Sequence, residues 1–310
     1  MKMDRQVERV ALNAFYQGKR VGGNALHLLV FSLLALTAHA AEIRVVGSDL
    51  LGDGFERAVA AFARQDDTAV KLDLRGTRPG TEHLAAGRAD VGLFLLPASE
   101  PPPVGAVVSR VMGYQVAVVV VPATSPLTQV TAGQLRGMFG EVAAGITRWG
   151  DLNLPGEWAA RPIVLRAVAP KDDLAWPLFQ RVILQDAEAK AGVELSPTGA
   201  AFAQRLLAAE NSIGVAGAGV TLTPGLRVLA LAAGPTEPAY APTADNVHSG
   251  SYPLRLVLYV AFRRAAAPDL QRFLKFLLAD ETAAALAPAG FVPLPVGVRN
   301  QLVFELEEMR

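Results

Sequence analysis

Short β-branched runs alternate with alanine- and leucine-rich amphipathic stretches from residue 41 to the end of the chain. The strand-like runs are 43–46, 70–74, 91–95, 116–121, 163–167, 228–232 and 254–262. The helix-like stretches lie near 54–65, 81–87, 131–139, 173–185, 199–209 and 268–279. Strands separated by helical patterns of 10–15 residues indicate βαβ units on mostly parallel sheets. The pattern therefore predicts an α/β fold.

The first forty residues follow a different pattern. A basic start that includes Lys2 and Arg20 leads into an apolar run at 25–36, and then into Ala38-His39-Ala40. A basic region, a short apolar core and a small-x-small triplet are read by a secretory peptidase. The run has about a dozen residues, where a bilayer-spanning helix needs roughly 20. We expect residues 1–40 to be a signal peptide cleaved near Ala40 and the mature chain to be periplasmic; an uncleaved membrane anchor is the alternative.

Charge and cysteine content narrow the class of partner. Residues 1–40 hold five basic and two acidic residues, and subtracting them from 29 of each sign leaves 24 basic and 27 acidic residues. A mature chain with this slight negative charge is not suited to bind nucleic acid or anionic lipid through bulk charge. The chain has no cysteine, which excludes disulfides, thiolate metal sites and a lipid-modified cysteine.

No motif of a common enzyme class is present. The chain lacks a Gly-x-Ser-x-Gly elbow, a P-loop and a His-Glu-x-x-His pair. After processing the histidines are His83 and His248, far apart in the sequence. The glycine-rich stretch 214–219 does not have the setting of a dinucleotide fingerprint, and we interpret it as a turn. We expect a protein that is not an enzyme and that has no cofactor and no metal site.

Three junctions between a strand-like run and a helix-like stretch contain glycine, hydroxyl or charged residues: 47–52, 75–81 and 166–173. Helix N-termini present unpaired backbone N–H groups and about half a positive charge. In open α/β sheets, ligands bind beyond the carboxyl ends of the strands, where these junctions fall. Several such ends around one cleft make an oxyanion site. The alternative is a set of ordinary helix caps, a role that suits Asp49, Asp172 and Asp173.

The order of several further segments resembles one family. These segments are 118–122, 131–140, 146–152 with Ile-Thr-Arg-Trp-Gly-Asp-Leu, 211–215 with Asn-Ser-Ile-Gly-Val, 251–255 with Ser-Tyr-Pro-Leu-Arg, and 290–294 with Gly-Phe-Val-Pro-Leu. Together they resemble the phosphate-binding proteins of ABC transporters, which are type II periplasmic solute-binding proteins. The resemblance implies a monomer with two lobes, each a mostly parallel sheet flanked by helices. Lobe 1 would comprise 41–114 plus 245–310, and lobe 2 would comprise 115–244.

The resemblance also implies where a ligand would bind. In the family, phosphate is held by a hydroxyl at the first junction, a hydroxyl at the second, and an arginine at the third. Thr77 takes the second position and Arg166 the third. The first position is Asp49, and its neighbour Ser48 can partly replace the missing hydroxyl.

Other elements of the family's site are missing. Leu95 stands where the family has a carboxylate that accepts a hydrogen bond from protonated phosphate, and Pro170-Lys171-Asp172 replaces a Ser-Gly-Thr triplet. Each lost hydrogen bond to a charged group costs about 1.5–3 kcal/mol. We therefore expect no tight phosphate binding; either the cleft binds another small solute, or Arg166 pairs internally with Asp49 or Asp172. The candidate ligand-binding residues are Ser48, Asp49, Thr77, Arg166, Lys171 and Asp172.

Two functions follow from the resemblance. In the first, the protein captures a small solute between its lobes, with oxyanions such as phosphate among the candidates, and delivers it to an ABC permease. In the second, the phosphate site is lost and the chain is a non-transport module that binds a protein partner or acts as a sensor.

Overall fold

The computed structural model describes residues 42–143, 145–170, 173–185 and 187–309. The expected signal peptide, Lys171 and Asp172 lie outside the described residues. Among the described residues, no helix combines the length and the apolar composition that crossing a membrane requires.

The first lobe is built on a mixed sheet. Its strands are β1 (Ile43–Gly47), β2 (Val70–Asp73), β3 (Val91–Pro97), β11 (Arg255–Arg263), β12 (Phe291–Pro293) and the first part of β4 (Val107–Pro122). β1 pairs in parallel with β2 and β3, whereas β11 runs antiparallel to β3 and β4. Its helices are α1 (Gly52–Gln65), α2 (Thr77–Ala85), α8 (Ala267–Leu277), α9 (Asp280–Leu286) and α10 (Val296–Glu308), with the short turns η4 (Arg264–Ala266) and η5 (Ala287–Ala289).

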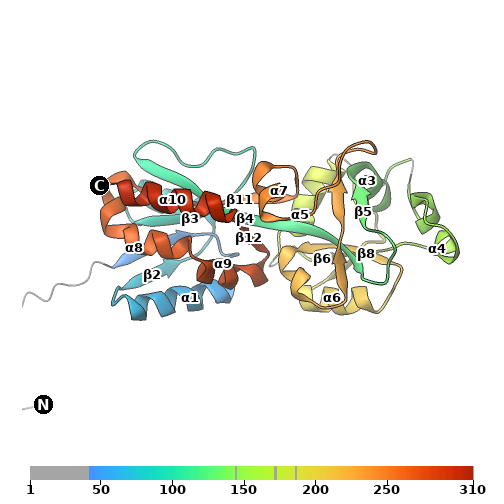
Figure 1. Cartoon of the computed structure of the whole chain (residues 1–310), viewed down its shortest axis with the longest axis horizontal. Helices are drawn as coiled ribbons and strands as arrows, with labels where there is room; N and C mark the ends of the chain where they lie inside the picture. The colour runs from blue at the N-terminus through green and yellow to red at the C-terminus, as the bar shows by residue number, and fades with distance from the viewer. Residues whose placement is uncertain (1–41, 144, 171–172, 186, 310) are drawn as a thin grey trace, which may run out of the picture. The chain divides into compact units, whose positions relative to one another are not determined.

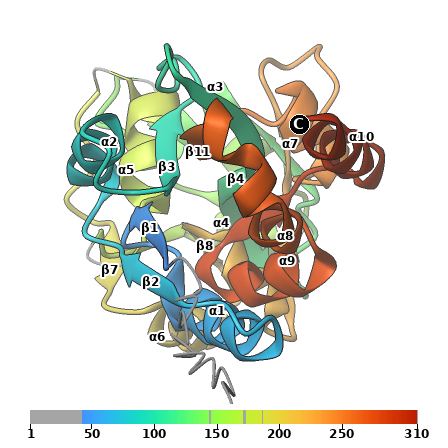
Figure 2. The ribbon, with the colours of Figure 1, turned by 90° about the vertical axis from the view of Figure 1, so that its left-hand side faces the viewer.

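Apolar side chains cover both faces of this sheet. The helical spacing of Phe55 and Val59 buries one stripe of α1 in a core shared with α8 and α9. On the other face, Leu84 of α2 packs with Phe94 in a smaller cluster. Figure 2 shows α2 on the side of β1 and β3 opposite to α8 and α9. The carboxyl ends of β1 and β2 lead into α1 and α2, so both junctions lie at the same edge of the sheet.

The second lobe repeats this arrangement with fewer strands. Its sheet contains β4, β6 (Val164–Val168), β7 (Glu194–Ser196), β8 (Ser212–Gly217) and β9 (Leu226–Val228), and a separate parallel pair joins β5 (Gln129–Thr131) to β10 (Ala230–Ala232). Its helices are α3 (Ala132–Phe139), α4 (Glu157–Ala160), α5 (Ala175–Phe179) and α6 (Gly199–Leu207), with the turns η1 (Trp149–Leu152), η2 (Gln180–Leu184) and η3 (Ala218–Leu222). The helix α7 (Ala244–Ser249) contacts β4 and β12. β6 is parallel to both β7 and β8.

The strand β4 links the two lobes. It pairs with β11 along its first part and with β8 and β9 along its second (Figure 1). From Met112 to Pro122 every residue is buried, because the strand has covered faces in both cores. The two large apolar clusters lie on either side of this crossing, one around Phe55 and Phe273 and the other around Trp149 and Phe202.

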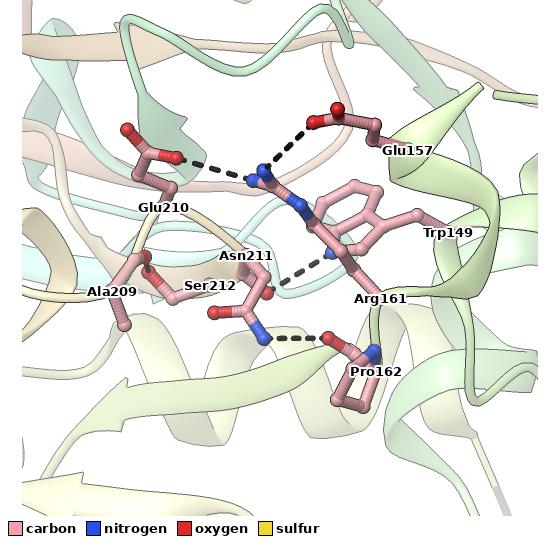
Figure 3. Close-up of polar contacts among 8 residues, drawn as sticks. All are labelled: Trp149, Glu157, Arg161, Pro162, Ala209, Glu210, Asn211 and Ser212. Atoms are coloured by element: carbon pink, nitrogen blue, oxygen red, sulfur yellow. Dashed lines mark hydrogen bonds and ion pairs between the residues drawn. The ribbon is translucent and has the colours of Figure 1, made fainter. Parts of the chain in front are cut away.

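Two of the segments that carried the resemblance contact each other at the amino ends of β6 and β8. Trp149 is fully buried, and its indole Nε1 donates a hydrogen bond to the Asn211 carbonyl at 3.1 Å (Figure 3). The Asn211 side-chain amide donates to the carbonyl of Pro162 at 2.7 Å (Figure 3). Trp158 packs edge-on against Trp149, with ring centroids 5.7 Å apart. This end of the lobe 2 sheet is closed by structural contacts.

The predicted two-lobed α/β fold is confirmed, with one difference in the sheets. In lobe 1, β1 is parallel to β2 and β3, and in lobe 2, β6 is parallel to β7 and β8. The strands β4 and β11 pair with their neighbours in antiparallel fashion, so the sheets are mixed rather than mostly parallel. The strand-like runs correspond to β1, β2, β3, the second part of β4, β6, the pair β9 and β10, and β11. The lobe boundaries at 114 and 244 stay a prediction.

Candidate functional site

A hollow of about 360 Å³ lies at the carboxyl ends of β6 and β8. Its remaining walls come from the first turn of α6, from η3 and, in lobe 1, from η5. The residues that line it are Val168, Ala169, Asp173, Pro197, Thr198, Gly199, Ala200, Ala216, Gly217, Gly219, Val220, Thr223, Pro288, Ala289 and Gly290. Parallel strands of α/β proteins carry their ligands at this edge, so the hollow is the candidate site.

A larger hollow, of about 550 Å³, is less suited to a ligand. It lies beside Arg44 and Asp90, at the amino ends of β1 and β3. Arg44 binds the Asp90 carboxylate through two hydrogen bonds, at 3.0 and 2.9 Å. Burial favours the neutral carboxyl, but the hydrogen bonds from Arg44 and the nearby Arg263 outweigh it and hold the pKa of Asp90 below its usual range. These charges are therefore already paired.

The first turn of α6 is formed by a short sequence motif. β7 ends at Ser196, Pro197 follows, and Thr198 has the extended backbone of an N-cap. The Thr198 hydroxyl accepts a hydrogen bond from the N–H of Ala201 at 3.2 Å. Such a cap satisfies one of the donors of the first turn and leaves the N–H groups of Gly199 and Ala200 facing outward from the helix end.

Asp173 forms the acidic side of the hollow. Its carboxylate accepts hydrogen bonds from the N–H of Ala175 at 2.7 Å and from the N–H of Gly217 at 2.9 Å. A Cβ on Gly217 would lie 3.0 Å from the carboxylate, so the glycine permits this close approach. Burial raises the pKa of Asp173, although the two hydrogen bonds oppose the change. The sequence suggested a helix cap here, and the bond to Gly217 adds a link between α5 and β8.

Glycines bring lobe 1 against the hollow. A Cβ on Gly219 would lie 2.1 Å from the carbonyl oxygen of Pro288, a distance that real Cβ atoms do not reach. Gly290 has φ +84° and closes η5 with a left-handed turn, where a glycine costs least. These two positions let η3 and η5 touch, so the hollow has one wall from each lobe.

The first junction of lobe 1 contains Ser48 and Asp49. Ser48 is buried, and its hydroxyl accepts a hydrogen bond from the N–H of Leu50 at 3.2 Å. Asp49 is exposed. The N–H of Gly76 donates to the carbonyl of Gly47 at 2.8 Å, so the first and second junctions are in contact.

At the second junction, Thr77 faces the strand β3. Its hydroxyl oxygen accepts a hydrogen bond from the N–H of Leu95 at 3.0 Å and lies 3.3 Å from the carbonyl of Leu95. The structure thus brings together the two positions that the resemblance assigns to a hydroxyl and a carboxylate. Leu95 is buried and apolar, so the pair offers no acceptor side chain.

Arg166 is held within lobe 2. It lies in the middle of β6 as the register partner of Glu194 on β7, and its guanidinium forms an ion pair with the Glu194 carboxylate. The sequence suggested Asp49 or Asp172 as the internal partner, and for Asp49 this suggestion is corrected, because the parallel register places Glu194 beside the arginine. Among the described candidates, Ser48, Asp49 and Thr77 gather in lobe 1, whereas Arg166 lies in the lobe 2 sheet.

The sequence reading missed most residues of the hollow. The stretch Ser196-Pro197-Thr198-Gly199 has the same strand-to-helix form as the three predicted junctions, but β7 has three residues and gives no clear strand pattern. The pair Thr198-Gly199 before an apolar helix was the available signal. Nothing local in the sequence indicated that residues 288–290 would form the opposite wall.

Comparisons with known proteins agree with this fold. Residues 35–281 match the model of the PBP superfamily domain. A curated relative, the phosphate-binding protein PstS of Pseudomonas aeruginosa, is 26% identical over 191 residues, which cover 59% of this chain and 58% of the relative. The chain therefore spans a little more than half the length of that relative.

Solved structures share the architecture at low sequence identity. PstS from Borrelia burgdorferi superposes with a TM-score of 0.62 at 14% identity, covering 82% of this chain and 99% of the other. An ABC-type phosphate transport receptor from Vibrio cholerae gives a TM-score of 0.59 at 15% identity, covering 82% and 100%. Since the family model spans well over half of the residues, this chain belongs to the PBP superfamily.

Proposed function

We propose that this chain is an exported solute-binding protein that captures a small solute between its two lobes and delivers it to an ABC importer. The observation that carries the proposal is the hollow at the carboxyl ends of β6 and β8, closed by η5 from the other lobe, in a member of the PBP superfamily. Because each lobe contributes one wall of the site, a bound solute stabilises the arrangement in which the two lobes are closed on it. A membrane partner can then recognise this closed arrangement.

The comparisons support this proposal through the names of the relatives. These are phosphate-binding proteins and a phosphate transport receptor, which are binding proteins rather than enzymes. By analogy we propose a monomer in the periplasm, with an ABC permease as its membrane partner and no catalytic step.

Phosphate is a poor candidate for the solute. Leu95 replaces the acceptor carboxylate, the Thr77 hydroxyl is bonded to the β3 backbone, and Arg166 pairs with Glu194. Losing three hydrogen bonds to a charged ligand, at about 1.5–3 kcal/mol each, lowers affinity by several powers of ten, since about 1.4 kcal/mol corresponds to one decade. We expect phosphate to bind no more tightly than the high micromolar range.

A thermal-shift screen of the mature chain tests the proposal. Inorganic phosphate, sulfate, molybdate, small organic acids, amino acids and divalent metals are added separately, and each solute that raises the melting temperature is followed by titration calorimetry. A solute at 100 times its Kd stabilises the folded chain by about 2.7 kcal/mol. Stabilisation by at least one solute supports the proposal; submicromolar phosphate binding contradicts the assignment of a poor phosphate site. No shift with any solute contradicts solute capture and favours the partner-binding or sensor module.

A further inference from the structure

Two segments of the chain pass between the lobes. The first is β4, which pairs with β11 up to Val116 and with β8 from Ala117 onward. The second runs from β10 in lobe 2 through α7 to β11 in lobe 1. The helix α7 contacts β4, so the two segments touch where the lobes join. We call residues 114–117 and 244–255 the hinge.

Two tyrosines join these segments by hydrogen bonds. The buried Tyr252 hydroxyl donates to the carbonyl of Ala117 at 2.9 Å. The Tyr114 hydroxyl lies 2.8 Å from Nδ1 of His248 on α7. A backbone carbonyl does not titrate, whereas a histidine side chain changes its charge between about pH 5 and 8. The bond between Tyr114 and His248, called the latch below, is therefore the one that can respond to pH near neutrality.

The phenol of Tyr114 is the donor in the latch. Burial raises the pKa of Tyr114; Arg255 opposes this change and Tyr259 adds to it. A phenol that keeps its proton donates its O–H, so we assign the unprotonated Nδ1 of neutral His248 as the acceptor. A protonated imidazole carries N–H at both nitrogens and would have to donate to the phenol oxygen instead.

A fixed positive charge faces the latch from the start of β11. The guanidinium of Arg255 lies over the Tyr114 ring, 5.0 Å from its centroid. It also donates to the carbonyls of Val247 and His248 at the end of α7. Among the described residues, neither Arg255 nor His248 forms an ion pair with a carboxylate. A proton on His248 would thus add a second positive charge beside an unneutralised one.

The other charged groups on the surrounding elements do not offset this repulsion. The charged pairs on β4 and on α10, which packs against the same apolar cluster as α7, are Arg110 with Glu305 and Arg299 with Asp280. β12 carries no titratable side chain. Asp245 on α7 is exposed, where solvent screens its charge, and Tyr259 is a phenol, which is uncharged near neutral pH. Asp173 lies next to α5, which Figure 2 shows on the opposite side of β4 from α7.

We propose that the latch is a pH-sensitive lock on the hinge: neutral His248 holds α7 against β4, and protonation of His248 releases α7 and lets the lobes move more freely. The bond from Tyr252 to Ala117 stays in place at both pH values. The two segments therefore remain joined, and the change is a loosening rather than an unfolding. The proposal concerns the movement of the lobes and holds whichever solute the hollow binds.

Hydrogen exchange measures the latch itself. The reporters are the N–H groups of Val247 and Tyr252, which donate to the carbonyls of Thr243 and Asn246. Their protection in the mature chain without solute is compared at about pH 7.5 and about pH 5.5, across the range in which histidine titrates, after correction for the intrinsic pH dependence of exchange. It is expected to fall about five-fold at the lower pH, the factor that one lost hydrogen bond gives.

Spin labels measure the movement of the lobes. The chain has no cysteine, so Arg57→Cys on α1 and Gln204→Cys on α6 place one label at an exposed position of each lobe. The distribution of distances between the labels is measured by double electron–electron resonance at the same two pH values. It is expected to be wider at the lower pH.

Three variants assign the response to the latch. His248→Asn puts an amide oxygen where Nδ1 stood, which keeps an acceptor for Tyr114 that does not titrate, so both pH responses should vanish. His83→Asn is the matched control: it removes the other histidine of the expected mature chain, on α2, and should keep both responses. Tyr114→Phe removes the donor and keeps the ring under Arg255, so protection should be low at both pH values.

The outcomes decide for or against the latch. If His248→Asn keeps the loss of protection seen in the wild type, another group such as Asp173 carries it and the proposal is overturned. A wild type with equal protection at both pH values overturns it as well. A loss of protection without any change in the label distances does so too, since the bond then holds α7 but not the lobes. Should His248→Asn fail to fold, as judged by circular dichroism, a wild-type pH response in Tyr114→Phe contradicts the proposal.

Discussion

The two ends of the lobe 2 sheet differ in how their polar groups are satisfied. At the amino ends of β6 and β8, Trp149 donates a hydrogen bond to the Asn211 carbonyl, and Arg161 pairs with Glu210 at 3.1 Å (Figure 3). The Arg161 guanidinium also lies over the ring of Trp158. At the carboxyl ends, helix N–H groups and the hydroxyl of Ser196 have no partner among the described residues.

Within one sheet, the polar groups at the amino ends are therefore bonded to each other, whereas some of those at the carboxyl ends are free to bind a solute. A polar group that is buried without a partner costs stability, so a fold retains such groups where something else binds them. The contacts at the amino ends hold the lobe together without any solute. At the carboxyl ends, the N–H groups of the first turn of α6 line the hollow and are expected to find acceptors when a solute fills it.

The largest loss in the free energy of unfolding is expected from removing the contacts at the amino ends of β6 and β8. Trp149→Ala removes a fully buried side chain, and such truncations lower the free energy of unfolding by about 3–5 kcal/mol. Urea unfolding followed by circular dichroism measures the loss. Trp149→Phe keeps most of the ring and loses the hydrogen bond to Asn211, so its loss should be nearer 1 kcal/mol, the usual net value of one hydrogen bond. A loss below 1 kcal/mol in Trp149→Ala would show that this end is not a structural anchor.

A smaller loss in the free energy of unfolding is expected from a substitution at the contact between η3 and η5, where the lobes meet. Gly219→Ala would place a Cβ 2.1 Å from the carbonyl oxygen of Pro288, and overpacking of this kind costs about 1–3 kcal/mol. It should also displace η5 and weaken solute binding. Gly192→Ala is the control, because a Cβ there meets nothing within 4 Å. Unchanged stability and binding in Gly219→Ala would mean that the contact between η3 and η5 is dispensable.

Two buried serines, one at each end of the lobe 2 sheet, allow a direct comparison of the two ends. Ser212 and Ser196 are both fully buried, but Ser212 is hydrogen-bonded and Ser196 is not. Ser212→Ala should lower the free energy of unfolding by about 1 kcal/mol, whereas Ser196→Ala should leave it unchanged or raise it slightly, since no hydrogen bond is lost. The measurement is urea unfolding without solute. Equal losses in the two variants would refute the contrast between the ends.

The smallest expected effect is the pH dependence that Asp173 gives to the free energy of unfolding. Because burial raises the pKa of Asp173, the stabilisation linked to its protonated form is fully present below the unfolded value of about 3.9 and is lost as pH rises through the folded value. Asp90 has the opposite sign: its lowered pKa gives stability above about 3.9 that is lost as pH falls through the folded value. In Asp173→Asn, the stability relative to wild type should therefore rise as pH increases from about 4. A flat difference in urea unfolding from pH 4 to 8 would contradict this assignment.

The sequence anticipated much of lobe 1 and the elements of both lobes. Alternating runs predicted β1, β2 and β3 to within two residues at each end, because local spacing of apolar residues determines which segments become strands and helices. The hydroxyl of Thr77 contacts the backbone of Leu95, while the assignment of the second junction to a ligand site stays a prediction. The short β7, the first part of β4 and the helix α10 were missed, as their patterns are too brief or too mixed to show one period.

By itself, the sequence determined most of the succession of strands and helices, the absence of cysteine, and an apolar leucine at position 95. The tertiary structure decided which residues share the hollow, because Thr198 and Pro288 are brought together by sheet order and by the contact of η3 with η5 rather than by neighbouring residues. It also decided the partner of Arg166. A parallel register joins residues that are distant along the chain, so Glu194 became its partner through pairing of β6 with β7, which no local pattern specifies.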